Sequence, residues 1–311
     1  MTEQDRMMRA VRIHTQAGPE ALVVEEAPYP YTAENDVVIR VHAAGFTPGE
    51  LDWPSTWKDR AGRLRGPVIP GHEVSGEVAG LGMGTAGLTV GQRVFGLTDW
   101  TRDGTLAEYV GVEARNLAPL PGPIDHIRGA ALPMAGLTAW QALFDHACLR
   151  PGQTVLVHGA GGAVGDLAVQ LAREAGARII GTGRERDRVA VLEVGAERFA
   201  ALDAEHFEEV AGQVDVVLDT IGGDVLDRSA AVVRPGGTLV SVTAPPKIRP
   251  TDGRAVFFVV ESNRDQLAEL ARLVQQGKLT PKVGAVRPLA ETRDAFLHKR
   301  GLPGKIIIQV A

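Results

Sequence analysis

A glycine-rich turn between an apolar strand and an amphipathic helix is the feature that most constrains this chain. Thr154–His158 is a run rich in β-branched residues, and Gly159, Gly162 and Gly165 then recur at every third position. In such a turn one glycine permits the sharp bend, another lets backbone N–H groups approach a pyrophosphate, and the third lets the helix pack closely on the sheet. A second apolar run, Ala177–Thr182, follows at the spacing of a βαβ unit. The segment therefore predicts a dinucleotide-binding unit, with a tight turn between packed elements as the alternative.

The end of this second run indicates which nucleotide binds. A carboxylate about 20 residues after the turn typically accepts hydrogen bonds from the ribose of NAD, whereas this chain has Gly183 there, followed by Arg184 and Arg186. Arginine forks favour a 2′-phosphate, so we expect NADP(H) over NAD(H). Glu185 leaves open a contact with the ribose hydroxyls, and the charged segment is also typical of a solvated first helical turn. The expected cofactor contacts in this unit are Gly159, Gly161, Gly162, Ala163, Val164, Gly165, Gly183, Arg184 and Arg186.

Length, composition and charge exclude several classes of protein. A chain of 311 residues that is 44% hydrophobic can bury a large core, and its length fits two domains better than one. A net charge of −5 gives no basic surface for nucleic acid. The chain has no apolar signal core and no run of about 18 apolar residues, so we expect a cytoplasmic protein without membrane spans. The single cysteine, Cys148, excludes an internal disulfide and a zinc site of several thiolates, and we expect it to be buried at a helix end.

The apolar runs divide the chain into a β-rich part and a part that alternates strands with helices. Short runs separated by Gly and Pro predict a small barrel-like lobe; they are Ala10–Ile13, Val37–Ala43, Val74–Ala79, Gln92–Gly96 and Ala107–Val110. Later strands alternate with helices, as a doubly wound parallel sheet requires; they are Thr154–His158, Ala177–Thr182, Val214–Asp219, Thr238–Thr243 and Val256–Val260. A helix capped by Ser262 and a strand at Lys305–Val310 follow. The predicted fold class is α/β.

Several motifs in a fixed order resemble those of one known family. They are PVIPGHEVSGEVAGLG, LTVGQRVFG, DGTLAEYV, LPMAGLTAWQAL, VLVHGAGGAVG, RPGGTLVSV and GKIIIQV. With these motifs the chain resembles, over nearly its whole length, the zinc-free quinone oxidoreductases of the medium-chain dehydrogenase/reductase superfamily. The resemblance implies a GroES-like β-rich catalytic domain in residues 1–124 and a Rossmann NADP-binding domain in residues 125–261. Residues 262–311 would return to complete the catalytic domain, with the active site in the cleft between the two domains.

The same resemblance implies further contacts and an assembly. Additional cofactor contacts would come from Thr138, Thr220, Val242 and Thr243. A homodimer is implied as well, in which Val256–Val260 is an edge strand that pairs across a two-fold axis. The alternative is that this strand lies inside the sheet, covered by the preceding helices.

The ligand set of the zinc-dependent relatives is incomplete in this chain. In zinc alcohol dehydrogenases a GHE histidine and two cysteines hold the metal. Here His72 and Glu73 are present, but Thr47 occupies the position of the first cysteine and Leu132–Met134 the region of the second. We therefore expect no catalytic metal and a hydrogen-bonded His72 under a turn. Without a Lewis acid to stabilise an alkoxide, an acceptor that spreads charge through its own π-system is favoured.

The resemblance also names catalytic candidates, with Thr47 beside the nicotinamide and Asp52 shortly after it. Thr47 is equally typical of a turn residue, Asp52 of a loop residue that satisfies backbone donors, and Thr138 of the cap of the helix it begins. The loop tryptophans either line a site for a planar ligand or plug the core; they are Trp53, Trp57 and Trp100. We expect NADPH-dependent hydride transfer to a quinone or conjugated enone. An enoyl-thioester reductase and a non-catalytic NADP(H)-binding redox sensor are the alternatives.

Overall fold

The computed structural model describes residues 6–298 and 302–311, which divide into two units. The first unit contains the described residues up to Met134, Ser262–Gln275 and the described residues from Val283 onward; the second contains Ala135–Glu261 and Gln276–Lys282. The domain limits predicted from the sequence, 1–124, 125–261 and 262–311, are not tested by this division and stay predictions. None of the helices in the described residues is long and apolar enough to cross a membrane.

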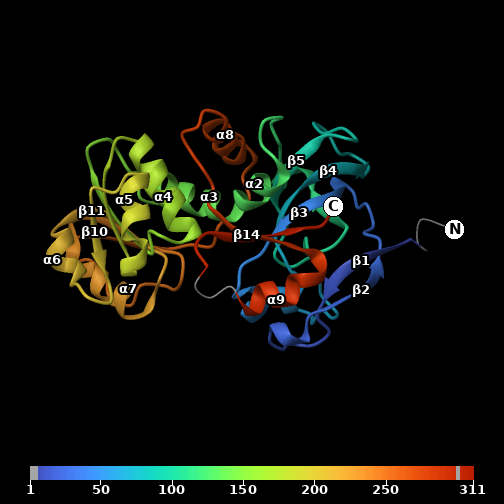
Figure 1. Cartoon of the computed structure of the whole chain (residues 1–311), viewed down its shortest axis with the longest axis horizontal. Helices are drawn as coiled ribbons and strands as arrows, with labels where there is room; N and C mark the ends of the chain where they lie inside the picture. Colours follow the sequence, from blue (N-terminus) through green and yellow to red (C-terminus); the bar gives the residue numbers. More distant parts are fainter. Residues whose placement is uncertain (1–5, 299–301) are drawn as a thin grey trace. The chain divides into compact units, whose positions relative to one another are not determined.

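A six-stranded parallel sheet forms the centre of the second unit (Figure 1). Its strands are β8 (Thr154–His158), β9 (Arg178–Gly183), β10 (Arg198–Ala201), β11 (Val214–Asp219), β12 (Val233–Ser241) and β13 (Gly253–Phe257). They lie in the order β10-β9-β8-β11-β12-β13, so the chain reverses direction across the sheet between β8 and β11. In open parallel sheets, ligands bind beyond the carboxyl ends of the strands at such a reversal. The predicted doubly wound sheet is confirmed, although the short strand β10 was not predicted.

Helices cover both faces of this sheet because its strands are apolar on both sides. They are α4 (Ala163–Glu174), α5 (Arg188–Val194), α6 (Phe207–Ala211) and α7 (Gly223–Ser229). Leu156, Ile180 and Val217 share one apolar cluster with residues of α6 and α7. Side chains alternate along a strand, so the intervening positions face α4 and α5; a Cβ on Gly181 would lie 2.6 Å from Val191 of α5. The sheet is therefore buried between two helical layers.

Two expectations for the second unit need correction. The last strand, β13, covers Gly253–Phe257 rather than Val256–Val260, and it lies at the edge of the sheet, which excludes the inner position. Cys148 is exposed and has a left-handed φ of 52° in the turn after the π-helical residues Gln141–His146. It is not buried at a helix end, because its conformation turns the side chain out of the core.

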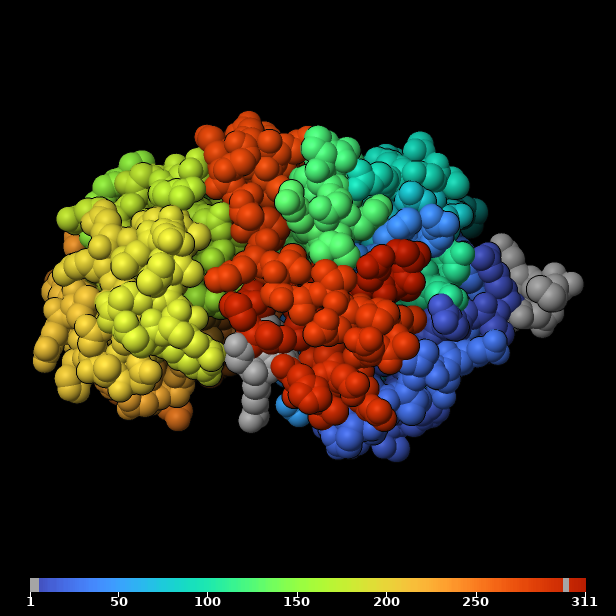
Figure 2. Space-filling view, viewed as in Figure 1, coloured from blue at the N-terminus to red at the C-terminus, as the bar shows by residue number. Residues whose placement is uncertain are grey.

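A second sheet, largely antiparallel, organises the first unit. Its strands are β3 (Asp36–Gly45), β4 (Glu73–Leu81), β5 (Arg93–Leu97), β6 (Tyr109–Glu113), β7 (Leu117–Pro119), β14 (Val283–Pro288) and β15 (Lys305–Gln309). β15 lies between β14 and β3, so residues from opposite ends of the sequence are neighbours. Figure 2 shows these C-terminal residues in red against N-terminal residues in blue. The hairpin of β1 (Met7–Arg12) and β2 (Val23–Pro28) forms a separate sheet.

Short helices complete the first unit. They are α1 (Pro54–Trp57), α2 (His126–Ala131), α8 (Arg264–Gln275) and α9 (Thr292–Leu297). A further helix, α3 (Pro133–Trp140), carries the chain from the first unit into the second. The predicted cap of α8 is shifted by one residue. Asn263 Oδ1 accepts from the N–H groups of Asp265 and Gln266 at 3.1 and 3.0 Å, whereas Ser262 Oγ donates to the carbonyl of Asn116.

Candidate active site

The glycine turn after β8 has the geometry of a dinucleotide-binding loop. Gly159 has a φ of 74°, a conformation that L side chains rarely adopt, so the chain can turn sharply there. A Cβ on Gly165 would lie 2.2 Å from the carbonyl oxygen of Gly159, which means that α4 packs on the turn only because residue 165 is glycine. Gly162, between them, is exposed and meets only the Gly159 oxygen at 3.2 Å. Its Cβ side is thus open to solvent, while its N–H donates to the carbonyl of Gly159 at 2.9 Å.

The predicted residues that flank Gly162 border the first turn of α4. Ala163 and Val164 are half-buried at the helix start, where unpaired N–H groups and the helix dipole favour an anion. Gly161 is buried against a residue that we did not single out from the sequence. A Cβ on Gly161 would lie 2.7 Å from both Cβ and Cγ of Asp187. The sequence signal for Asp187 is its place three residues after Arg184, which is that of a capping residue.

The end of β9 carries both cations and carboxylates. Arg184 and Arg186 are exposed, and no ion pair of either is found among the described residues. Glu185 is bound by Arg188 through contacts of 2.8 to 3.0 Å, so its carboxylate is already occupied. The Asp187 carboxylate lies 3.4 Å from where a Cβ on Gly183 would be. An acid is therefore present near this strand end, although residue 183 itself offers none.

A buried carboxylate fixes the loops after β11 and β12. Asp219, fully buried at the end of β11, accepts from the N–H of Gly222 and from the hydroxyls of Ser241 and Thr243, all at 3.0 Å. Thr220 Oγ1 donates to the carbonyl of His158 at 2.8 Å. Asp219 thus holds Thr243 directly, while the neighbouring Thr220 is held by His158. Sequence analysis named Asp219 only as the last residue of a predicted strand.

The remaining predicted contacts of the second unit lie in different settings. Val242 is half-buried, and its N–H donates to the carbonyl of Asp219 at 3.2 Å. Thr138 is buried within α3 rather than at its start, so it does not cap the helix. His158, at the end of β8, bonds Thr182 Oγ1 at 2.8 Å and Ser229 Oγ at 3.0 Å, and burial lowers its pKa. A neutral His158 network therefore underlies the carboxyl ends of these strands.

In the first unit, a buried glutamate holds the backbone around Thr47. Glu50 Oε2 accepts from the N–H of Thr47 at 2.9 Å, and its Oε1 accepts from the N–H of Gly71 at 2.6 Å. Burial raises the pKa of Glu50 to about 7 despite these two donors. Thr47 itself is half-buried. Asp52, the other catalytic candidate, is exposed in the next turn, so the carboxylate that organises this region is Glu50, which sequence analysis missed.

His72 is one of two buried polar side chains in the described residues that have an atom without a hydrogen-bond partner, the other being Thr105. It is 2% exposed, and its Nδ1 lies 3.2 Å from Thr98 Oγ1, which confirms the predicted hydrogen bond. Its Nε2 has no hydrogen-bond partner among the described residues. Burial lowers the pKa of His72 to about 4, so the ring is neutral near pH 7. The rings of Trp53 and Trp100 lie 6.2 and 4.9 Å from the His72 ring, measured between centroids.

The tryptophans of this region have two roles. Trp53 and Trp100 are half-buried and pack edge to face, at 5.7 Å, beside His72. Trp57 is 4% exposed and donates to the carbonyl of Leu51 at 2.8 Å, so it belongs to the core. Flat indole faces suit a planar ligand. Trp53 and Trp100 are therefore the indoles that lie against His72.

Glu73 ties the motif that contains His72 to a distant strand. Its carboxylate forms a buried ion pair with Lys305 of β15, and its Oε1 accepts from the N–H of Met134 at 3.0 Å. Burial raises the pKa of Glu73. Sequence analysis could not identify this pair, because its members are 232 positions apart. Glu73 is therefore a structural anchor of the first unit.

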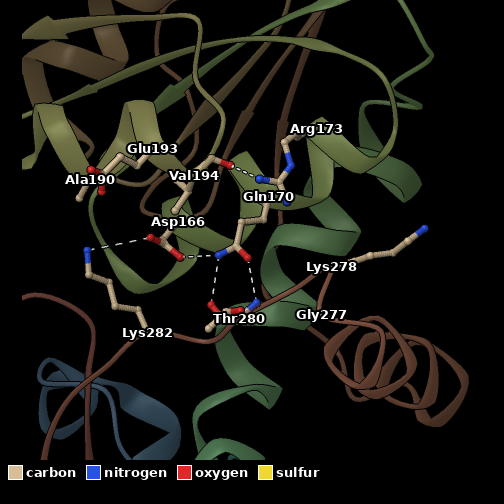
Figure 3. A pocket seen from close by; sticks show the side chains of 10 residues that line it. All are labelled: Asp166, Gln170, Arg173, Ala190, Glu193, Val194, Gly277, Lys278, Thr280 and Lys282. Atoms are coloured by element: carbon tan, nitrogen blue, oxygen red, sulfur yellow. Dashed lines mark hydrogen bonds and ion pairs between the residues drawn. The ribbon is translucent and has the colours of Figure 1, made fainter.

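A surface pocket of about 430 Å³ lies elsewhere on the second unit (Figure 3). Gln170 of α4 binds both the N–H and the carbonyl of Thr280, at 2.8 and 3.1 Å, and also Asp166 at 2.7 Å. Lys282 approaches Asp166 at 4.0 Å. None of the predicted site residues lines this pocket. Its contacts fasten residues 276–282 to α4.

Two family descriptions match the chain. An alcohol dehydrogenase GroES-like domain matches residues 33–122, and a zinc-binding dehydrogenase domain matches residues 194–308. The donors around His72 do not fit a catalytic zinc ion: its neighbours are Thr98, Trp53 and Trp100, and no group of three potential ligands that includes His72 occurs among the described residues. The glycine turn, in contrast, fits the pyrophosphate of a nicotinamide dinucleotide.

Individual proteins extend this match to the full length. The human quinone oxidoreductase is 31% identical, with 99% of each chain covered. A 2-methylene-furan-3-one reductase of Solanum lycopersicum is 31% identical over 90% of this chain and 73% of the relative. The structure of the Coxiella burnetii quinone oxidoreductase superposes with a TM-score of 0.90 at 28% identity, covering 98% of this chain and all of the other. The chain therefore belongs to the quinone oxidoreductase group of the medium-chain dehydrogenase/reductase superfamily, whose members are enzymes that bind a nicotinamide cofactor.

Proposed function

We propose that this enzyme reduces a quinone or a conjugated enone with NADPH and without a catalytic metal. The observation that carries the proposal is His72: its neutral ring lies beside two indole rings, and within residues 6–298 and 302–311 its Nε2 has no hydrogen-bond partner. A bound nicotinamide supplies the hydride. A quinone or enone then needs stabilisation of the negative charge that develops on its carbonyl oxygen, and hydrogen-bond donors in a site that excludes water can give it.

His72 would be the donor to that oxygen; because its Nε2 is buried here, Trp53 or Trp100 would have to move aside for the acceptor to reach it. If the Thr98 hydroxyl donates to Nδ1, the proton of the neutral ring is on Nε2, the free nitrogen. A neutral imidazole can donate this hydrogen bond while a proton from water completes the reduction. Trp53 and Trp100 would hold the flat acceptor against it. Thr47, whose N–H is bound by Glu50, would lie near the reacting atoms. Asp52 would be the second catalytic residue, placed in the exposed turn that follows.

The preference for NADPH would come from the end of β9. Arg184 and Arg186 are exposed and without ion pairs in the part of the chain that the structure describes, so they remain available to a 2′-phosphate. Glu185 is occupied by Arg188, which removes the alternative contact with the ribose. Asp187 opposes this preference, because its carboxylate near Gly161 would repel the phosphate and accept from ribose hydroxyls. The proposal is that the two arginines outweigh it.

The name of the tomato relative supports enones as acceptors. A 2-methylene-furan-3-one has an exocyclic double bond conjugated with a carbonyl, so the relative's name describes reduction of this class. For the present chain we propose small planar quinones and enones alike, since both place a carbonyl oxygen next to an extended π-system.

The test is NADPH oxidation by chelator-treated protein with ortho-quinones, para-quinones, small enones, an enoyl thioester and a primary alcohol, with NADH as the alternative donor. His72→Phe removes the donor and is expected to lower kcat/KM for quinones about 100-fold, the size of an oxyanion-donor loss, with the Kd of NADPH unchanged. His298→Phe, at an exposed histidine, is the matched control. Activity lost on chelation while the protein stays folded and His42→Ala remains active, or a His72→Phe enzyme as fast as wild type, would refute the proposal. Turnover confined to the thioester would favour the alternative enzyme.

We also propose a cytoplasmic homodimer that pairs through β13. This strand is the sheet edge, and Phe257 in it is 39% exposed. A charged side chain there would oppose strand pairing, so light scattering should find a dimer for the wild type and a monomer for Phe257→Lys. A monomeric wild type would contradict the assembly and leave the reaction untouched.

A further inference from the structure

Two histidines and a glutamate converge in the first unit, away from Thr47 and His72. His42 is on β3, Glu77 is on β4 and His126 is the first residue of α2. Their ligand atoms all lie within 4.8 Å of one another, and each residue is half-buried. The two imidazole rings stack, with centroids 4.3 Å apart and planes 16° from parallel. Among the described residues this is the one set of three such groups.

Neighbouring donors determine where the ring lone pairs point. A guanidinium can only donate, and Arg40 Nη2 lies 3.1 Å from His42 Nε2 while Arg93 Nε lies 3.4 Å from His126 Nε2. Both Nε2 atoms must therefore accept, so both carry a lone pair. Ser75 Oγ, 2.8 Å from His126 Nδ1, accepts the proton on the other side of that ring. A second partner that fixes the tautomer in this way is typical of metal-binding histidines.

The protonation states also suit a cation. Burial lowers the pKa of His42, and burial together with neighbouring cations lowers that of His126 to about 4. Both rings are thus neutral near pH 7, as ligation requires. Glu77 supplies a negative charge, and its Oε2 lies 3.6 Å from His42 Nε2.

The arginines that now satisfy these acceptors have other positions available. Arg93 donates to the carbonyls of Ile124 and Gly122 at 2.6 and 3.1 Å, so its longer contact with His126 is the weakest of these bonds. The Arg40 side chain is 48% exposed and binds Glu77 at 3.1 Å. It can turn into solvent without leaving a buried charge. A metal ion would then replace two N–H donors.

We propose that His42, Glu77 and His126 bind one divalent transition-metal ion, such as Zn²⁺. Two imidazoles and a carboxylate are a common ligand set for such ions, with water in the remaining position. The ion would link the start of α2 to β3 and β4. The inference does not depend on the proposed reaction.

The test uses Co²⁺ as a spectroscopic probe of the full-length protein after chelator treatment. One equivalent should give the ligand-field absorption of a site with nitrogen and oxygen ligands, and Zn²⁺ should displace it. His42→Ala and His126→Ala should each weaken binding at least about 100-fold, and Ser75→Ala about tenfold. His14→Ala, which removes a histidine paired with Glu25 elsewhere, should bind as wild type.

The variant Arg40→Ala distinguishes a metal-binding site from a polar cluster whose acceptors are simply hydrogen-bonded by arginines. Loss of a competing donor and a positive charge should tighten Co²⁺ binding several-fold, whereas a polar cluster would only lose stability. In the wild type, saturating Zn²⁺ should protect His42 and His126 from acylation and leave His14 reactive, a readout that needs no variant to fold. Absence of the absorption, equal affinity in His126→Ala, or unprotected His42 and His126 would each overturn the proposal.

Discussion

The glycine turn of the second unit and the Thr47–Trp57 region of the first differ in how their shape is determined. At the turn, backbone geometry determines the shape: Gly159 adopts a positive φ, and residue 165 must lack a Cβ for α4 to pack. Around Thr47, side chains from distant positions do it, with Glu50 bonded to Gly71 and His72 to Thr98. A backbone motif is contiguous and readable in a sequence, whereas a set of side chains becomes visible only after folding. Substitutions in the two kinds of site should therefore have different effects on binding and stability.

The largest effect should follow from Gly165→Val. The new side chain would meet the Gly159 oxygen, a backbone atom that cannot move without opening the turn. We expect NADPH binding to be lost in calorimetry and the free energy of unfolding to fall by about 3 kcal/mol. Gly162→Ala is the matched control, since its Cβ would meet only one atom at 3.2 Å, and it should fold normally. A Gly165→Val protein that still binds NADPH would show that the turn is not set by its backbone.

In the first unit, the free energy of unfolding should depend on pH through Glu50. Glu50 has a pKa of about 7 when folded and 4.5 when exposed, so between these values the unfolded chain has lost a proton that the folded chain keeps. The contribution of Glu50 to stability should therefore fall by about 3 kcal/mol as pH rises from 4.5 to 7. His72 and His126, whose pKa values are lowered to about 4, contribute with the opposite sign over this range, so the effect of Glu50 is read from the difference between wild type and Glu50→Gln. Urea unfolding followed by tryptophan fluorescence measures it, since Trp53, Trp57 and Trp100 lie in this unit and only Trp140 lies in the second. Relative to wild type, Glu50→Gln should gain stability as pH rises over this range; a difference that does not change with pH would assign the effect to other groups.

Cofactor selectivity should respond to side chains even in the second unit. Replacing Arg184 and Arg186 together by alanine removes charge-assisted hydrogen bonds to a 2′-phosphate. We expect the Kd of NADPH to rise about 30-fold, equivalent to about 2 kcal/mol, with little change for NADH. Asp187→Asn should shift the preference the other way, since it removes the opposing charge. Equal losses for both cofactors would place the arginines outside the phosphate contact.

The smallest effect concerns the cap of α8. Asn263→Ala removes the acceptor of two helix N–H groups and should lower the free energy of unfolding by about 1 kcal/mol. Ser262→Ala removes one hydrogen bond, to Asn116, and should cost about 0.5 kcal/mol. Thermal unfolding of the two variants gives the order. The reverse order would restore the cap predicted from the sequence.

What the sequence predicted follows the same division. The strands β8, β9 and β11, the helix α4 and the parallel sheet could be predicted because each rests on a contiguous apolar pattern. Asp187 and Asp219 are close in sequence to predicted residues, but their roles depend on which loop they meet in three dimensions.

The first unit was harder to predict. Glu50 was passed over in favour of Asp52, since only burial separates two acids in one turn. The partner of Glu73, Lys305, lies on a strand that the sequence places at the far end of the chain. Pairing across such a separation leaves no local pattern.

The position of β15 between β14 and β3 has a consequence for biosynthesis. Residues of β1 and β3 leave the ribosome before the second unit, yet their apolar cluster also needs Phe296, Ile306 and Ile308. The parallel sheet of the second unit, whose strands are all contained in residues 154–257, can form while those residues are still untranslated. The first unit therefore begins to be synthesised before the second unit but can be completed only after it. Until then the strands β1 and β3 expose apolar residues, and these are the strands that a chaperone would need to shield.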